Sequence, residues 1–303
     1  MNNITQKITT LRKAVACAVL KVSTPQTIAA IENRQVPKGD VREFARAAGL
    51  LAIKKTSDVI PDCHPLPIEY AAITSALNGL EITITVEVHT IYRTGVEVEA
   101  MHGAAIAALT MYDMLKPLDK GIEISTIKLM DKKGGKSDFS DTLSKPLRAA
   151  VVVCSDSVFA GKKTDTAGKA IIEKLQTYNI QNPVYRLLPD EKDQIQQLLL
   201  ELCANGQDLI LITGGTGLSA RDVTPEAVKP LITREIPGIM EAARNYGQSR
   251  TPYAMLSRGV AGMVGNTLVI TLPGSTRGAQ ETIDALFPYL LHVFKVAEGA
   301  RHD

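Results

Sequence analysis

The stretch LILITGGTGLSARDVTPE, residues 209–226, decides the fold of the second half of the chain. Its four apolar residues stop at a glycine-rich TGGTG sequence, and a helix start, Thr-Pro-Glu, follows at 224–226. This order predicts a buried strand that delivers a glycine-rich loop to a helix. Such a loop lets a phosphate or a pterin edge approach exposed N–H groups. An ordinary strand-to-helix turn would look similar, but Arg221 and Asp222 follow the glycines within ten residues.

Apolar strands alternate regularly with amphipathic helices around this stretch, which predicts a mostly parallel, doubly wound α/β sheet for residues 148–303. The expected strands are residues 149–154, 184–188, 209–213 and 268–272, and the expected helices are residues 165–178, 191–204 and 280–296. Asp156, Asp190 and Asp222 follow strand ends, where open sheets bind ligands. Two such carboxylates suit a Mg²⁺-nucleotide site, although Asp190 is equally well placed to cap a helix.

The first half shows a different pattern. Residues 11–20 fit a strand or a helix, and we favour a strand because a helix opens with Pro25 soon afterwards. Asn78-Gly79 predicts a hairpin between two further strands, residues 68–76 and 81–91. An alanine-rich helix then ends before Pro117, a strand follows at 122–130, and a basic flexible tail follows at 132–138. The polar residues 141–147 are the expected linker between domains 1–140 and 148–303.

Composition limits the classes of function. The chain has 303 residues, 45% of them apolar, and a formal net charge of +2. The near-neutral charge, the absence of Trp and an aromatic content of 4% argue against a nucleic-acid partner. No run approaches the roughly 18 apolar residues of a membrane span, and the polar start MNNITQK is unlike a signal peptide. Four scattered cysteines predict neither disulfides nor structural zinc, so we expect a cytoplasmic protein without a membrane partner.

Two residues of the first half suggest chemistry by their spacing. Asp113 and Lys116 are three apart on the expected helix, so an acid and an amine share one face. A surface ion pair would have the same spacing and is an equally good interpretation.

Five motifs of the first half closely resemble the MoaC family of cyclic pyranopterin monophosphate synthases: KGDV (38–41), CHPLP (63–67), TGVEVEA (94–100), ALTMYDMLK (108–116) and KGGKSDF (133–139). The resemblance implies a ferredoxin-like α+β fold and a hexamer with sites between subunits. It implies that cyclic dihydroguanosine triphosphate becomes cyclic pyranopterin monophosphate with release of pyrophosphate. The implied catalytic residues are Asp113, Lys116 and Lys132. The implied substrate-binding residues are Arg12, Lys38, Asp62, Cys63, His64, Val98, Glu99 and Lys136.

Motifs of the second half, among them SDS, LLPDE, ITGGTG, RDVTPEA, REIPGIMEAAR, AMLSRGVAG and LPGST, resemble the MogA/MoaB family of molybdopterin adenylyltransferases. The resemblance implies transfer of AMP from Mg-ATP to molybdopterin. It implies that Asp190 and Asp222 are the catalytic acids and the Mg²⁺ ligands. The implied ligand-binding residues are Ser155, Gly214, Gly215, Thr216, Gly217, Ser257, Pro273, Gly274 and Ser275.

The combined expectation is a bifunctional enzyme of molybdenum-cofactor synthesis with pterin and nucleotide substrates. Mg²⁺ arrives with ATP, and no tightly bound cofactor is expected. The resemblance implies a homo-oligomer, trimer or hexamer, and contacts with other molybdenum-cofactor enzymes, because sulfur must be inserted between the two reactions. The alternative is a second half that only binds molybdopterin or acts as a scaffold, and the presence of both Asp190 and Asp222 favours the enzyme.

Overall fold

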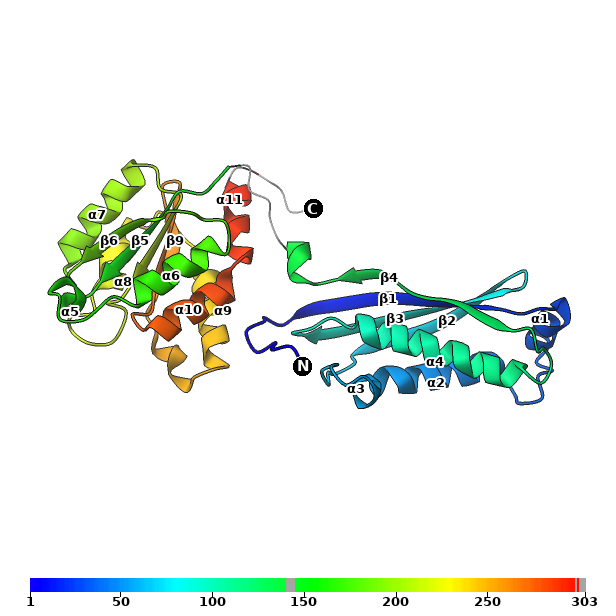
Figure 1. The fold of residues 1–303 in the computed structure, drawn as a ribbon. Coiled ribbons are helices and arrows are strands. Elements are labelled where there is room, and N and C mark those ends of the chain that lie inside the picture. Colours follow the sequence, from blue (N-terminus) through cyan, green and yellow to red (C-terminus); the bar gives the residue numbers. More distant parts are fainter. Residues whose placement is uncertain (140–144, 298, 300–303) are drawn as a thin grey trace. The chain divides into compact units, whose positions relative to one another are not determined.

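The computed structural model describes residues 1–139, 145–297 and 299, without the side chains of Lys136 and Ser137. It contains two compact units, residues 1–139 and 140–303 (Figure 1). The predicted linker, residues 141–147, falls mostly outside the described residues. Among the helices described, none is long and apolar enough to cross a membrane.

The first unit is built on a four-stranded antiparallel sheet with the strand order β2-β3-β1-β4. Residues of β3 alternate between buried and half-exposed, so one face of the sheet covers the core. The strand interpretation of residues 11–20 is confirmed, and the order is consistent with the expected ferredoxin-like α+β fold. The strands are β1 (Thr10–Lys21), β2 (Tyr70–Asn78), β3 (Glu81–Tyr92) and β4 (Glu123–Lys133).

Helices α2 and α4 pack on each other and on one face of this sheet (Figure 1). Asp40 caps α2, since its carboxylate accepts hydrogen bonds from the N–H groups of Arg42 (3.0 Å) and Glu43 (3.2 Å). The first part of the core-facing side of α4 has small residues such as Ala104 and Ala107, which let α2 approach closely. The helices are α1 (Pro25–Glu32), α2 (Val41–Lys54), α3 (Thr56–Val59) and α4 (Glu97–Leu115).

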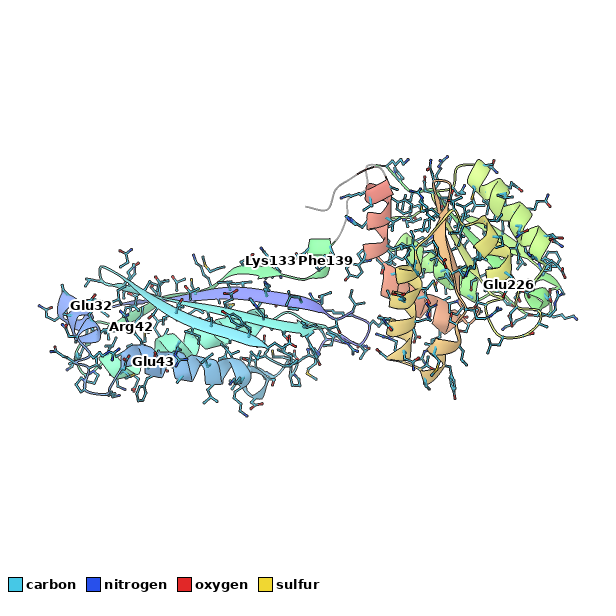
Figure 2. The ribbon with its side chains drawn as sticks, turned by 180° about the vertical axis from the view of Figure 1, so that it is seen from behind. Glu32, Arg42, Glu43, Lys133, Phe139 and Glu226 are labelled. Atoms are coloured by element: carbon cyan, nitrogen blue, oxygen red, sulfur yellow. The ribbon has the colours of Figure 1, made fainter. Side chains whose placement is uncertain are left out.

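The expected flexible tail at 132–138 is wrong in its first part. Lys132 and Lys133 continue β4 and pair with Ala14 and Lys13 of β1, and a 3-10 helix, η1 (Lys136–Phe139), follows. The long β1 offers backbone groups beyond the apolar part of β4, so pairing continues although both lysines are exposed. Lys133 and Phe139 lie at the end of this unit remote from Glu32 of α1 (Figure 2).

The second unit contains a mixed six-stranded sheet with the order β6-β5-β7-β10-β9-β8. The first four strands are parallel, as predicted. Strand β9 pairs antiparallel with both β10 and the edge strand β8, and the sequence pattern did not indicate β8 or β9. The strands are β5 (Ala149–Cys154), β6 (Val184–Leu188), β7 (Leu209–Thr213), β8 (Arg234–Glu235), β9 (Ala261–Val264) and β10 (Thr267–Leu272).

Both faces of this sheet are covered, as a doubly wound fold requires. Alternate residues of β5 and β7, such as Val152 and Ile210, pack in one core with α7 and α8. Their neighbours Val151 and Leu211 are equally buried and face the other side, where α10 contacts both α6 and α9. The helices are α5 (Asp156–Phe159), α6 (Ala167–Gln176), α7 (Lys192–Ala204), α8 (Thr224–Val228), η2 (Lys229–Leu231), α9 (Pro237–Gln248), η3 (Pro252–Leu256), α10 (Thr276–Leu286), η4 (Tyr289–Leu291) and α11 (His292–Ala297).

The single helix expected at 280–296 is wrong. Helix α10 begins earlier, at Thr276, and ends at Leu286, and the chain resumes helical structure only in η4 and α11. Pro288 explains the interruption, because proline disfavours the helical conformation of the preceding residue and donates no hydrogen bond.

Candidate active sites

The loop between β7 and α8 requires glycine for a steric reason. Gly214 has a φ of 98°, and a Cβ atom there would lie 2.0 Å from the carbonyl oxygen of Cys154 at the end of β5. The loop after β10 packs closely against the same residue, since a Cβ on Gly274 would lie 3.1 Å from Gly214 Cα. The Thr213 hydroxyl ties the two loops by donating to the Pro273 carbonyl at 2.7 Å.

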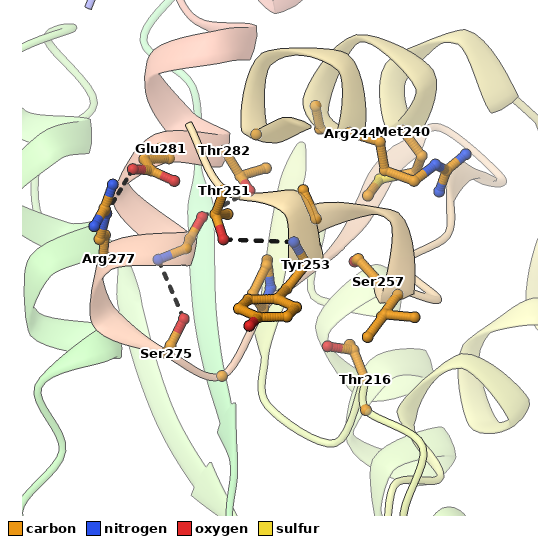
Figure 3. Close-up of a pocket in the computed structure, with 18 of the residues that line it drawn as sticks. Thr216, Met240, Arg244, Thr251, Tyr253, Ser257, Ser275, Arg277, Glu281 and Thr282 are labelled. Carbon is orange, nitrogen blue, oxygen red and sulfur yellow. Dashed lines mark hydrogen bonds and ion pairs between the residues drawn. The ribbon is translucent and has the colours of Figure 1, made fainter. Parts of the chain in front are cut away.

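A cavity of about 500 Å³ lies at this edge of the sheet, bounded by the glycine-rich loop, α9, η3 and the start of α10 (Figure 3). The structure brings eight of the predicted residues together in its wall: Gly215, Thr216, Gly217, Asp222, Ser257, Pro273, Gly274 and Ser275. Three other predicted residues, Ser155, Gly214 and Asp190, are not part of the wall.

Asp190 lies behind the glycine-rich loop. Its Oδ2 atom accepts a hydrogen bond from the N–H of Asp156 at 3.0 Å, and its own N–H donates to Asp156 Oδ1 at 3.0 Å. Its Oδ1 atom is buried without a hydrogen-bond partner among the described residues and lies 2.9 Å from the position of a Cβ on Gly215. Burial raises the pKa of Asp190, and the negative charges of Asp156 and Asp222 raise it further.

Asp190 does not cap α7. The residue at the cap position is Glu191, which makes no capping hydrogen bond with its side chain. Asp190 turns instead toward the end of β5, so its carboxylate belongs to the acidic group formed with Asp156. Ser155, by contrast, is a cap: its hydroxyl accepts from the N–H of Val158 at 3.4 Å at the start of α5.

The cavity contains residues that the sequence motifs did not single out. They come from α9, η3 and α10, and they are Met240, Arg244, Thr251, Tyr253, Arg277, Glu281 and Thr282 (Figure 3). Arg277 donates to Glu281 at 2.8 Å, one turn along α10. The sequence motifs did point toward two of these residues, because Arg244 ends the motif REIPGIMEAAR and Arg277 follows LPGST directly.

A second cavity, also of about 500 Å³, opens at the other end of the parallel strands. Lys145 and Arg148 before β5, Asp208 before β7 and Asn266 before β10 line it. None of the predicted site residues is in its wall.

In the first unit, Asp113 lies between two ammonium groups. Lys38 Nζ is 2.7 Å from Asp113 Oδ2, and Lys116 Nζ is 2.7 Å from Asp113 Oδ1. Hydrogen bonds from Lys116 and Lys38 lower the pKa of Asp113 to about 2. All three side chains are exposed. The pair inferred from spacing is therefore a triad with two cations, formed at the C-terminal end of α4.

A different group of predicted residues lies at the N-terminal end of α4. The Cys63 thiol donates to Glu99 Oε1 at 3.1 Å, and Glu99 is only 3% exposed. Burial raises the pKa of Cys63 to about 12, helped by the hydrogen bond to Glu99, and burial likewise raises the pKa of Glu99. Glu99 Oε2 is buried and has no protein partner in the described part of the chain. This oxygen is available to a donor from a ligand.

The remaining predicted residues of this unit are scattered. Lys132 pairs with Glu97 at 3.3 Å, at the same end of α4 as Glu99. Arg12 is buried, and its Nε donates to the Tyr92 carbonyl at 3.4 Å. His64 is half-buried and Val98 is exposed. The exposed Asp62 pairs with the amino group of Met1 at 3.0 Å. The side chain of Lys136 lies outside the described part of the chain.

The two groups of the first unit cannot meet within one chain. Glu99 and Asp113 are 14 residues apart on α4, which at 1.5 Å per residue separates them by about 21 Å along the helix axis. Arg42 and Glu43 of α2 lie toward the same end of the unit as Glu32, and Lys133 lies at the other end (Figure 2). Lys38 comes just before α2 and therefore lies at the end of the unit with Arg42. Lys132 is next to Lys133 and lies at the opposite end.

The acids of the second unit fit a magnesium ion that arrives with a nucleotide. Within the described residues, no group of three or more His, Cys, Asp or Glu side chains could hold a metal by itself. Mg²⁺ takes one or two carboxylates together with phosphate oxygens, so a resident three-ligand site is not needed. The unpartnered Asp190 Oδ1 and the charge interaction between Asp190 and Asp222 fit that donor set.

Comparison with known proteins divides the chain in the same way. Residues 1–135 match the MoaC family, and residues 150–292 match the probable molybdopterin binding domain. A molybdenum cofactor biosynthesis bifunctional protein of Chlorobaculum tepidum is 39% identical. The match covers 100% of this chain and 96% of the relative's length. Its counterpart in Synechococcus elongatus is 36% identical, and that match covers 100% of this chain and 98% of the relative's length. A cyclic pyranopterin monophosphate synthase of a Nostoc species is 45% identical over 45% of this chain and 82% of its own length.

Proposed function

Because this chain belongs to the family of bifunctional molybdenum cofactor biosynthesis proteins, we propose that each of its two units catalyses one reaction of that synthesis. The first unit would act as a cyclic pyranopterin monophosphate synthase and the second as a molybdopterin adenylyltransferase. The two sites are built from separate parts of the sequence, so each proposal has its own test.

For the first unit, the observation that carries the proposal is the placement of Asp113 between Lys38 and Lys116. The substrate is a triphosphate, which needs several cations, and the pyrophosphate that leaves gains charge as it departs. The two ammonium groups would bind these phosphates. Asp113 stays ionised at physiological pH, because its pKa is about 2, and would keep both lysines oriented.

We further propose that two protomers assemble this site. The Asp113 group and the Glu99 group come from different motifs of the same family, yet about 21 Å of helix separates them in one chain. A homo-oligomer that brings the Asp113 end of one chain beside the Glu99 end of its partner would bring both groups to one substrate. There, the unpartnered Glu99 Oε2 would accept hydrogen bonds from the pterin.

For the second unit, the cavity wall carries the proposal. The N–H groups of the glycine-rich loop would bind phosphate oxygens, and Asp222 stands in the same wall. Asp190 and Asp222 would hold the Mg²⁺ of Mg-ATP, which neutralises charge on the phosphates during transfer of AMP to molybdopterin. The alternative is a carrier that binds molybdopterin in the cavity without transferring AMP. A carrier has no need of the partnerless Asp190 oxygen behind the loop.

The test uses the purified full-length chain in two assays. With molybdopterin and Mg-ATP, we expect adenylylated molybdopterin and pyrophosphate, and Asp222→Asn should abolish both while molybdopterin still binds. With cyclic dihydroguanosine triphosphate, we expect cyclic pyranopterin monophosphate, and Asp113→Asn should abolish it. Molybdopterin binding without turnover by the wild-type protein would make the second unit a carrier and would leave the first proposal standing.

A further inference from the structure

The segment that presents Asp222 to the cavity has little apolar packing of its own. Residues 217–221 are all exposed, and the one large apolar side chain among them, Leu218, is 70% exposed. Within the segment, Asp222 Oδ2 accepts from the Ser219 N–H at 2.8 Å, and the Asp222 N–H donates to the Ser219 carbonyl at 2.9 Å. The position of the segment relative to the glycine-rich loop therefore depends on polar contacts from elsewhere.

Arg221 of the segment pairs with Asp156 at 2.8 Å and with Glu191 at 3.0 Å on one side. Arg258 supplies the contacts that join the two ends of the segment. Its Nε donates to the Gly217 carbonyl at 2.7 Å, and its Nη2 donates to the Asp222 carbonyl at 2.6 Å. Its Nη1 pairs with Glu226 of α8. One guanidinium thus joins both ends of the segment and ties them to the following helix. The planar fork of an arginine suits several acceptors at fixed angles, which a lysine ammonium does not reproduce.

The backbone that carries Arg258 is itself held firmly. A Cβ on the neighbouring Gly259 would lie 2.5 Å from Met240 Cε of α9 and 3.1 Å from the Thr271 carbonyl of β10. The Val260 N–H donates to the Thr271 hydroxyl at 2.8 Å. The guanidinium therefore extends from a packed part of the fold toward an exposed segment. Arg258 is not part of the cavity wall, so it acts through the residues that it holds.

We propose that Arg258 is a positioning residue that holds the 217–222 segment in place and thereby fixes the position of the Asp222 carboxylate at the cavity. The catalytic consequence rests on the proposed transfer of AMP, whereas the mechanical role does not. A displacement of about 1 Å at a reacting group costs on the order of a hundredfold in rate. Loss of the guanidinium should therefore lower kcat and leave the affinity for substrates nearly unchanged.

The kinetic test compares Arg258→Ala and Arg258→Lys with the wild-type full-length chain. We expect kcat for AMP transfer to fall roughly a hundredfold in Arg258→Ala, with KM for ATP changed less than about threefold. Arg258→Lys should recover only part of the rate, and added guanidinium ion should partly rescue Arg258→Ala. The matched control is Arg234→Ala, which also removes an arginine that donates to a backbone carbonyl, that of Gly265 at 3.4 Å, outside the cavity wall.

Hydrogen–deuterium exchange gives a readout that needs no activity. We expect the peptide covering residues 217–222 to exchange at least about tenfold faster in Arg258→Ala and Arg258→Lys than in the wild type. The Arg234→Ala control should leave it unchanged. Unchanged exchange in both Arg258 variants would overturn the proposal. Faster exchange together with a wild-type protein that transfers no AMP would instead refute the proposed function and retain the role of Arg258 in holding the segment.

Discussion

Asp119 holds together the turn after α4 and the start of α1. Its Oδ2 atom accepts from the Ser23 N–H at 2.7 Å and the Thr27 hydroxyl at 3.1 Å, and its Oδ1 atom accepts from the Gly121 N–H at 2.9 Å. Burial alone would raise the pKa of Asp119, but the hydrogen bonds from Ser23, Gly121 and Thr27 outweigh it and lower the pKa to about 2. The ionised carboxylate is thus the form that stabilises the first unit.

The predicted consequence is a loss of stability that depends on pH. Asp119→Asn should lower the free energy of unfolding of the first unit by about 2 kcal/mol at neutral pH, as expected for hydrogen bonds to a charged group. A pKa lowered by folding stabilises the protein above the unfolded value, near 4, and that contribution disappears as pH falls through about 2. Calorimetry of both proteins between pH 7 and pH 2 tests this. A difference that stays constant over the whole range would contradict it.

Gly214 tests whether the loop requires glycine. Gly214→Ala places a Cβ 2.0 Å from the Cys154 carbonyl at a φ of 98°, so the loop must shift. We expect a loss of about 3 kcal/mol or more in the second unit and no measurable AMP transfer. Gly161→Ala is the control, because Gly161 also has a positive φ, 70°, but open space around it, and should cost only about 1 kcal/mol. Equal effects of the two substitutions in calorimetry would show that the contact with Cys154 is unimportant.

At the scale of elements, the sequence predicted those strands and turns that are determined by apolar patterns or by local turn residues. The parallel strands were found because both faces are buried, and the hairpin was found because Asn78-Gly79 is a strong turn signal; Gly79 indeed has a φ of 59°. Strands β8 and β9 were missed because they are short. The pairing of β8 with β9 joins residues distant in the chain, whereas β9 forms a hairpin with β10 across Gly265-Asn266, a turn signal that the sequence interpretation did not use. The break at Pro288 was a visible signal that the expected helix at 280–296 did not take into account.

Site residues were predictable in type and less so in their grouping. The glycine-rich loop and Asp222 lie where a strand end predicts them. That Asp190 contacts Asp156 rather than capping α7 could not be read from spacing, because β5 and β6 are adjacent only in the folded sheet. The same holds for Lys38, which reaches Asp113 across 75 residues of chain.

The packing of α2 on α4 yields an element-scale prediction. Ala107 is fully buried in α4, and a Cβ on Gly49 of α2 would lie 3.3 Å from its side chain. Ala107→Leu should therefore overpack this contact and destabilise the first unit by about 1–3 kcal/mol. The half-exposed Ala105 on the same helix provides the control, since Ala105→Leu should change stability little. Two separate calorimetric transitions would also show whether the second unit is unaffected, and equal losses for the two variants would contradict the packing argument.

At the scale of the whole molecule, α4 explains why this chain should need a second copy. Near its C-terminus the helix presents Asp113, which pairs with Lys116 and with Lys38 from before α2, and near its N-terminus it carries Glu99, a buried acid whose Oε2 has no partner among the described residues. Neither group alone provides both the cations for a triphosphate and an acceptor for a pterin. The second unit, in contrast, gathers its glycine-rich loop, Asp222 and both arginines of the wall around one cavity in one chain. Association between copies therefore matters for the first proposed reaction and not in the same way for the second.

Subunit complementation tests this directly. Asp113→Asn and Glu99→Gln should each abolish synthesis of cyclic pyranopterin monophosphate when expressed alone. When the two variants are expressed together in equal amounts, a site that takes one group from each of two protomers is intact in about a quarter of cases, so about a quarter of the wild-type activity should return. Activity per mole of protein, compared with a mixture of the separately purified variants assayed before subunits exchange, gives the measurement. No recovery in the coexpressed assembly, with its oligomeric state unchanged, would place both groups in sites formed by single chains.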